Sequence, residues 1–280
     1  MNDLIDDVLR LAAFADGDRG GNPAGVWIGD ALPSPEAMRR TAAAVGFSET
    51  AFAARCATGH RVRYFSPESE VPFCGHATIA LGAALARREG DGVFPLELNE
   101  ATISVEGHDD EVRPSAALRS PPTRSETADP AMTEAVLTLF GHDRDRLEPS
   151  LPPARIHAGA DHFLLALRSR EILRTMHYDL DAGRRLMNEA GLVTIALVVA
   201  EGERRFHARN AFASGGVLED PATGAATAAL GGYLRDIGWP HGGAIDVVQG
   251  EDMGARSHLH AEIPPGRGES VRVSGTVRYL

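Results

Sequence analysis

The sequence predicts an α+β protein of two similar halves, each with strands wrapped around one buried helix. Residues 77–88 and 225–235 are predicted helices whose side chains are apolar almost all round, and such helices are typically enclosed by protein. Residues 70–85 also align without gaps on residues 219–234, with nine of 16 positions identical: Glu, Pro, Gly, Ala, Thr, Ala, Leu, Gly and Leu. Shared composition explains some matches, but Glu, Pro, Gly and Thr in one register indicate a duplication.

The first half is predicted to span residues 1–120. A glycine-rich turn is expected over residues 17–25, and Ser34-Pro35-Glu36 should open a helix that ends at Gly46, because Ser is a good N-cap and Pro fits the first helical position. Strands are expected at residues 8–15, 47–56, 61–65, 96–98 and 101–105.

The second half is predicted to span residues 121–280, with the C-terminal strand able to return to the first half. The chain becomes polar and proline-containing over residues 106–130, which is typical of a domain boundary. Beyond the boundary, helices are expected at residues 131–140 and 181–190, and strands at residues 162–167, from Leu192, and at 245–249, 257–263 and 271–280.

Composition excludes several classes of function. The 280 residues include 28 basic and 39 acidic ones, for a net charge of −11, and 43% are hydrophobic. These values are ordinary for a globular protein, and an acidic surface disfavours nucleic acid as a partner. Every basic residue is Arg. Without a Lys amine, Schiff-base and pyridoxal-phosphate chemistry is excluded.

The chain carries no signal for export or membrane insertion. Its start lacks a basic and apolar leader, and two cysteines are too few for a disulfide framework. The longest apolar run, residues 192–200, is much shorter than the ~20 residues that cross a bilayer. We therefore expect a cytoplasmic protein with no membrane partner.

Each buried helix is preceded by small residues and entered through a glycine, Gly75 or Gly224. The first backbone N–H groups of a helix have no partner within it, and the helix dipole favours negative charge there. We therefore expect the two helix starts to bind an anion such as a substrate carboxylate. Because binding sites often lie at domain interfaces, the expected place is between the halves.

Several short motifs occur in a fixed order along almost the whole chain. In the first half they are Gly21-Asn22-Pro23-Ala24-Gly25-Val26, Phe47-Ser48-Glu49-Thr50-Ala51-Phe52, Tyr64-Phe65-Ser66-Pro67 and Glu70-Val71-Pro72-Phe73-Cys74-Gly75-His76-Ala77-Thr78. In the second half they are Glu219-Asp220-Pro221-Ala222-Thr223-Gly224, Gln249-Gly250, Met253-Gly254 and Ser257.

Through these motifs the chain resembles the PhzF-like isomerases, which have the diaminopimelate-epimerase-like fold. The resemblance implies two pseudo-symmetric halves, each a rolled β-sheet around a buried central helix, and a homodimer. It also implies proton transfer on a small carboxylate substrate without a cofactor or a metal.

The resemblance also implies roles for individual residues. Glu49 corresponds to the catalytic general acid/base, and His76 and Asp220 to partners that orient the substrate and share its protons. From the residues alone, Glu49 on an exposed strand edge, His76 as a polar residue in a first helical turn and Asp220 as a helix cap are simpler interpretations. The substrate-binding positions implied are Asn22, Gly75, Thr223, Gly224, Ala225 and Gln249.

Cys74 raises the alternative of a racemase. Cofactor-independent racemases of this fold use two cysteines, one before the glycine at each helix start. Here the repeat places Thr223 opposite Cys74, and a threonine hydroxyl is too weak a base, so we expect Cys74 to be a packed residue near the site. The alternation of His258, His260 and Glu262 could place metal ligands on one strand, but a solvated strand face is the simpler interpretation.

The predicted function is a cofactor-independent isomerase that shifts a double bond or a hydrogen in a small unsaturated carboxylate or amino-acid-derived metabolite, with secondary-metabolite biosynthesis as one setting. Ala225 stands where phenazine-type members have a serine, so the resemblance leaves the substrate open. The alternatives are an epimerase or racemase of the same fold, and a non-catalytic binding protein.

Overall fold

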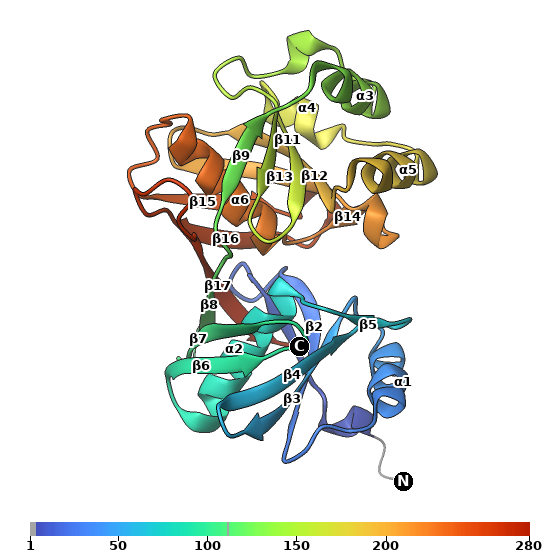
Figure 1. Ribbon diagram of the computed structural model, residues 1–280, viewed down its shortest axis with the longest axis vertical. Helices are drawn as coiled ribbons and strands as arrows, with labels where there is room; N and C mark the ends of the chain where they lie inside the picture. The colour runs from blue at the N-terminus through green and yellow to red at the C-terminus, as the bar shows by residue number, and fades with distance from the viewer. Residues whose placement is uncertain (1–3, 111) are drawn as a thin grey trace. The chain divides into compact units, whose positions relative to one another are not determined.

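The computed structural model describes residues 4–110 and 112–280, and the chain divides into two units (Figure 1). One unit comprises Met1–Arg119 with Ser274–Leu280, and the other comprises Ser120–Val273. The last strand therefore contributes its C-terminal part to the first unit. Among the described residues, no helix has both the length and the apolar character that a bilayer crossing requires.

In the first unit, eight strands form a closed ring. Each strand pairs with the next and the last pairs with the first; the pairs β2–β3 and β4–β6 are parallel. A ninth short strand, β5 (Glu70–Val71), pairs with β4. The ring consists of β1 (Leu9–Ala13), β2 (Asn22–Gly29), β3 (Thr50–Cys56), β4 (Gly59–Phe65), β6 (Gly92–Glu97), β7 (Thr102–His108), β8 (Ser115–Arg119) and β17 (Arg272–Tyr279).

Helix α2 (Gly75–Glu89) lies inside this ring (Figure 1), and its residues from His76 to Ala86 are all buried. The predicted buried helix is thus confirmed. Glycine allows the helix to approach the strands closely, because a Cβ on Gly82 would lie 2.5 Å from Val105 Cγ2 and one on Gly107 would lie 2.2 Å from the Gly82 carbonyl oxygen.

Helix α1 (Pro35–Val45) begins and ends as its sequence predicts. The Ser34 hydroxyl accepts a hydrogen bond from Ala37 N, and Gly46 ends the helix in the left-handed conformation. The helix contributes Met38 and Ala42 to a cluster of buried apolar residues, whose other members are Val8, Trp27, Phe52 and Phe65. A short 3₁₀ helix, η1 (Leu4–Asp7), precedes β1.

The second unit repeats the order and sense of strand pairing found in the first. Its pairs β11–β12 and β13–β15 are parallel, as are β2–β3 and β4–β6. Helix α6 (Gly224–Asp236) is the buried counterpart of α2. The strands are β9 (Arg124–Thr127), β10 (Ala154–His157), β11 (Asp161–Ala166), β12 (Thr194–Ala200), β13 (Arg205–Ala211), β14 (Glu219–Asp220), β15 (Ala244–Gln249) and β16 (Ser257–Glu262).

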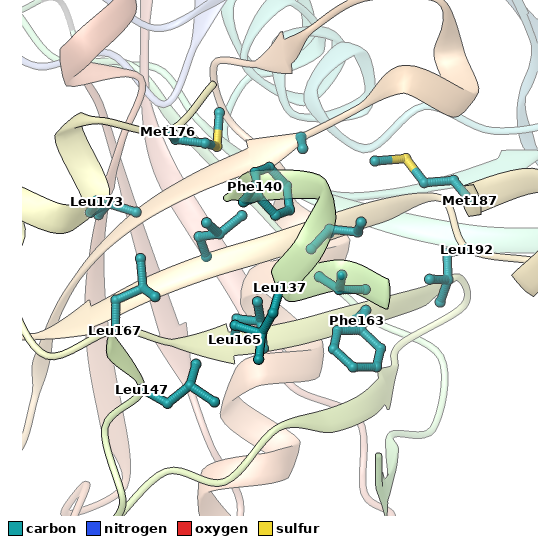
Figure 2. Close-up of a cluster of buried hydrophobic side chains, with 14 of the residues drawn as sticks. Leu137, Phe140, Leu147, Phe163, Leu165, Leu167, Leu173, Met176, Met187 and Leu192 are labelled. Atoms are coloured by element: carbon teal, nitrogen blue, oxygen red, sulfur yellow. The ribbon is translucent and has the colours of Figure 1, made fainter. Parts of the chain in front are cut away.

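Three helices cover the other face of these strands: α3 (Pro130–Phe140), α4 (Arg170–Arg174) and α5 (Leu180–Ala190). Helices α4 and α5 connect the parallel strands β11 and β12, as α1 connects β2 and β3 in the first unit. Figure 2 shows the apolar core that results, in which Leu137 of α3 lies beside Leu165 and Phe163 of β11, and Phe140 of α3 belongs to the same cluster. Among the described residues, three short 3₁₀ helices follow η1: η2 (Arg144–Arg146), η3 (Ala213–Gly215) and η4 (Glu251–Met253). Burial on both faces explains why residues 195–200 form an unbroken apolar run.

The duplication includes an ion pair in each unit. Arg63 of β4 binds Glu70 of β5, and Arg209 of β13 binds Glu219 of β14, with Nε–Oε1 distances of 2.8 and 3.1 Å. Both Glu residues lie in the strand pair that leads into the buried helix. The Arg63 guanidinium lowers the pKa of Glu70. Each pair therefore anchors the segment from which its helix begins.

The structure corrects three predictions of secondary structure. The predicted turn over residues 17–25 overlaps β2, which begins at Asn22, and the predicted strand over residues 47–56 begins only at Thr50. Residues 106–130, predicted as a polar boundary, contain the strands β8 and β9. In the first and third cases, Pro, Gly or charged residues conceal strands that are held by pairing with distant partners rather than by local preference.

We expect Gly107→Ala to lower the free energy of unfolding by about 1–3 kcal/mol, because the new Cβ would overlap the α2 backbone. The matched control is Gly92→Ala. Gly92 pairs directly with Gly107, but its Cβ would meet only Phe94, at 3.8 Å. Urea unfolding measures both variants. Equal stability of the two variants would contradict the close packing of α2 against β7.

His162 of β11 is fully buried, with Nδ1 2.8 Å from Thr194 Oγ1 and with no hydrogen-bond partner for Nε2 among the described residues. Burial lowers the pKa of His162 from 6.5 to about 4, because the charged imidazolium is costly to desolvate. The folded protein therefore keeps this histidine neutral.

As the pH falls below 6.5, the unfolded chain binds a proton at His162 before the folded protein does. We expect the free energy of unfolding to fall by roughly 3 kcal/mol between pH 6.5 and 4, with no contribution from this group above pH 7. His162→Gln should remove this step, whereas His260→Gln, at a half-exposed histidine beside Asp246, should retain it. Urea unfolding across this range gives the test, and an unchanged pH slope in His162→Gln would refute it.

Candidate active site

Three side chains of the first unit meet at the start of α2. Cys74 Sγ donates a hydrogen bond to Glu49 Oε2 at 3.5 Å, and His76 Nε2 lies 3.5 Å from the same oxygen. Cys74 Sγ also lies 3.4 Å from His76 Nδ1. Ser48 Oγ, 3.4 Å from His76 Nε2, completes the group. The structure thus brings together Glu49 and His76, which the family resemblance named.

The local fold fixes Glu49 at the end of a strand. Glu49 directly precedes β3, and its carbonyl accepts a hydrogen bond from Gly25 N of β2 at 3.1 Å. A side chain at residue 25 would meet Thr50 Oγ1 at 2.6 Å, so glycine is required for this approach. The glycine at position 25 therefore has a physical reason in the β2–β3 pair.

The first backbone N–H groups of α2 have no partner within the helix. Cys74 is the N-cap in an extended conformation, and its side chain makes no capping hydrogen bond. The Cys74 carbonyl accepts hydrogen bonds from Thr78 N (3.0 Å) and from Thr78 Oγ1 (2.7 Å). Tyr64 OH lies 2.7 Å from the same hydroxyl, and burial raises the pKa of Tyr64. These contacts hold the helix start rigidly.

The site is largely shielded from water. The side chains of His76 and Glu49 are 8% and 18% exposed, and Cys74 is buried. Electrostatic interactions are stronger in such surroundings than in bulk water. The carboxylate, imidazole and thiol lie within 4.8 Å of one another and include the three ligand types that also bind metal ions. A group of this kind can exchange protons or hold a cation.

A second polar cluster occupies the equivalent place at the start of α6. Thr223 Oγ1 donates to Asp220 Oδ2 at 2.5 Å, while Gln249 Nε2 donates to the Asp220 carbonyl at 2.6 Å and to Thr223 Oγ1 at 3.0 Å. Gln249 Oε1 accepts from Thr223 N at 3.2 Å. Gln249 is completely buried. Its amide holds the turn before α6 through these hydrogen bonds.

The remaining predicted positions lie at the ends of elements. Asn22 is the buried first residue of β2, Gly75 and Gly224 are the first residues of α2 and α6, and Ala225 is the second residue of α6. Sequence reasoning missed the contact of Ser48 with His76; the only signal for it was the position of Ser48 beside Glu49.

The possible metal-binding strand has other interactions. His260 Nδ1 lies 2.8 Å from Asp246 Oδ1, and Arg272 donates to Glu262 at 2.6 Å. Two of the three candidate ligands, His260 and Glu262, are thus paired with other side chains. Within the described part of the chain, the one group of residues with metal-ligand geometry is Glu49, Cys74 and His76.

Comparison with known proteins identifies the family. The phenazine biosynthesis-like protein family, PhzC-PhzF, matches residues 11–279. The chain is 31% identical to an uncharacterized isomerase of Deinococcus radiodurans, covering 95% of this chain and 90% of that protein. It is 30% identical to the trans-2,3-dihydro-3-hydroxyanthranilate isomerase of Pseudomonas aeruginosa, covering 95% and 94%.

A solved structure agrees with the sequence relationship. The crystal structure of a PhzF-family phenazine biosynthesis protein from Bacillus anthracis superposes with a TM-score of 0.85 at 22% identity, covering 98% of this chain and 96% of that one. The predicted fold of two pseudo-symmetric halves, each with strands around a buried helix, is thus confirmed. This chain belongs to the phenazine biosynthesis-like family, PhzC-PhzF, and is an isomerase.

Proposed function

We propose that this isomerase moves a hydrogen from one carbon to another in a small unsaturated carboxylate, and that Glu49 both takes the hydrogen and returns it. The observation that carries this proposal is the shielded contact of Glu49 with His76 at the start of α2. A carboxyl group in such surroundings can serve as general base in one step and general acid in the next.

The reaction needs a place for the negative charge that develops on the substrate. The first N–H groups of α2 have no partner within the helix and supply hydrogen-bond donors, and the helix dipole favours an anion there. They would bind the substrate carboxylate and stabilise the enolate-like charge that forms when the proton leaves. Since α2 is held from all sides, these donors need no rearrangement during the reaction.

The proton balance is then simple. The Glu49 carboxylate removes a proton from a carbon next to the conjugated system, and the electron pair of that C–H bond enters the system. Glu49, now protonated, gives the proton to the carbon at the other end, and the double bond moves. His76, 3.5 Å from the carboxylate, orients Glu49 and binds a polar group of the substrate.

For the second cluster we assign Asp220 a part in proton sharing and Thr223 and Gly224 a part in substrate binding. Gln249 acts as a positioning residue, because its amide is fully used in holding Asp220 and Thr223. The relative from Pseudomonas aeruginosa is named for its action on trans-2,3-dihydro-3-hydroxyanthranilate. On this basis we propose the same substrate class for this chain, a cyclic unsaturated carboxylate. Ala225, which adds no hydroxyl to this region, selects among members of this class.

A mechanism with two thiol bases is disfavoured by the second helix start. Thr223 is the N-cap of α6, as Cys74 is of α2, and its hydroxyl donates to Asp220. A hydroxyl engaged in this way is not a base for a carbon acid. Cys56, the only other cysteine, lies at the end of β3. One-base hydrogen transfer therefore accounts for the cluster better than racemisation does.

We expect Glu49→Gln to lower kcat/KM by about 10²–10⁴-fold while the protein stays folded, because the amide keeps the shape of the carboxylate but cannot accept the proton. Conversion of trans-2,3-dihydro-3-hydroxyanthranilate, followed by absorbance, is the first assay. Related cyclic unsaturated carboxylates follow in the same format.

The matched control is Glu68→Gln, a carboxylate in the exposed loop between β4 and β5, which should retain full activity. If Glu49→Gln turned over any accepted substrate at the rate of the Glu68→Gln control, the proposed role of Glu49 would be wrong.

A further inference from the structure

The Glu49, Cys74 and His76 side chains lie close enough together to hold a metal ion. Glu49 Oε2 lies 3.5 Å from Cys74 Sγ and 3.5 Å from His76 Nε2, and the sulfur and Nε2 are 3.9 Å apart. Tetrahedral zinc, with its usual bonds to oxygen, nitrogen and sulfur, separates such ligand atoms by about 3.4–3.6 Å. These separations are close to those of one face of a zinc tetrahedron. Because Cys74 Sγ lies nearer to His76 Nδ1, at 3.4 Å, the imidazole also has to turn when Nε2 binds the ion.

The surroundings favour zinc over other abundant divalent cations. A thiolate and an imidazole are suited to Zn²⁺, whereas Mg²⁺ and Ca²⁺ prefer oxygen ligands. Two of the ligands, Cys74 and His76, belong to the rigid start of α2, and the third ends the loop before β3. Because all three side chains are mostly buried, few solvent contacts are lost on binding. Three protein ligands leave a fourth position for water.

We propose that this cluster binds one Zn²⁺ ion reversibly and that the bound ion inhibits the isomerase. In the binding step, the Cys74 thiol loses its proton to solvent, and bonds form from zinc to Sγ, to Glu49 Oε2 and to His76 Nε2. The inhibition rests on the proposed function, because zinc would occupy the carboxylate that has to accept the substrate hydrogen.

Zinc binding can be measured without any substrate. Metal-free protein, kept reduced with a phosphine rather than a thiol, is titrated with ZnCl₂ in a calorimeter. We expect one Zn²⁺ per chain, and at least tenfold weaker binding in Cys74→Ser and in Glu49→Gln. The matched control is Cys56→Ser, which removes the other thiol and should bind zinc as the wild type does.

Cobalt reports the ligands themselves. Co²⁺ in place of Zn²⁺ should give a thiolate-to-cobalt charge-transfer band that Cys74→Ser abolishes and Cys56→Ser retains. Binding that is absent, that survives Cys74→Ser, or that depends on Cys56 would overturn the zinc site.

Activity in metal-free buffer separates this inference from the proposed function. Added Zn²⁺ should stop wild-type turnover in proportion to its binding, and a chelator should restore it. Binding at the cluster without loss of turnover would overturn the inhibition. If Glu49→Gln lost zinc binding but kept its metal-free activity, the role of Glu49 as proton carrier would fail while the zinc site would stand.

Discussion

The arrangement of the first unit depends on how closely a helix can approach the strands that surround it. Glycines at positions 82 and 107 bring the backbone of α2 against β7, and side chains there would overlap. Since protein interiors are close-packed and tolerate little displacement, this contact fixes the height and rotation of the helix. The start of α2, with Cys74 and His76, is therefore placed beside Glu49 by packing and not by the polar contacts alone.

Duplication produced two related helix starts with different chemistry. Both units share the pairing order of their strands and an Arg–Glu ion pair before the buried helix. They differ at the N-cap, where Cys74 stands in one unit and Thr223 in the other. The first cluster combines a carboxylate with a histidine and a thiol, and the second combines a carboxylate with a hydroxyl and an amide. This asymmetry favours a single proton carrier over a symmetric pair of bases.

Much of the fold could be predicted from sequence, because local signals set it. Ser34 and Gly46 delimit α1 as their capping preferences indicate, and the two apolar helices are buried. Strands such as β2 and β13 were not predicted, since Pro23 and Gly25 obscure the pattern of β2, and the polar residues Arg205, His207 and Arg209 obscure that of β13. The contact of Glu49 with Cys74, 25 residues apart in sequence, arises from tertiary packing, so only the family resemblance pointed to this site. The Arg–Glu pairs were missed because the loop between each pair differs in length.

The central claim is that one shielded carboxyl group takes a hydrogen and returns the same hydrogen. A single turnover in deuterium oxide, with the product analysed by mass spectrometry and NMR, tests this claim most directly. The Glu49 side chain is only 18% exposed, so the proton it has taken should reach the second carbon before all of it is exchanged for solvent deuterium. A measurable fraction of the product should therefore carry the original protium at the new carbon. Complete incorporation of solvent deuterium at that carbon in the first turnover would contradict the account.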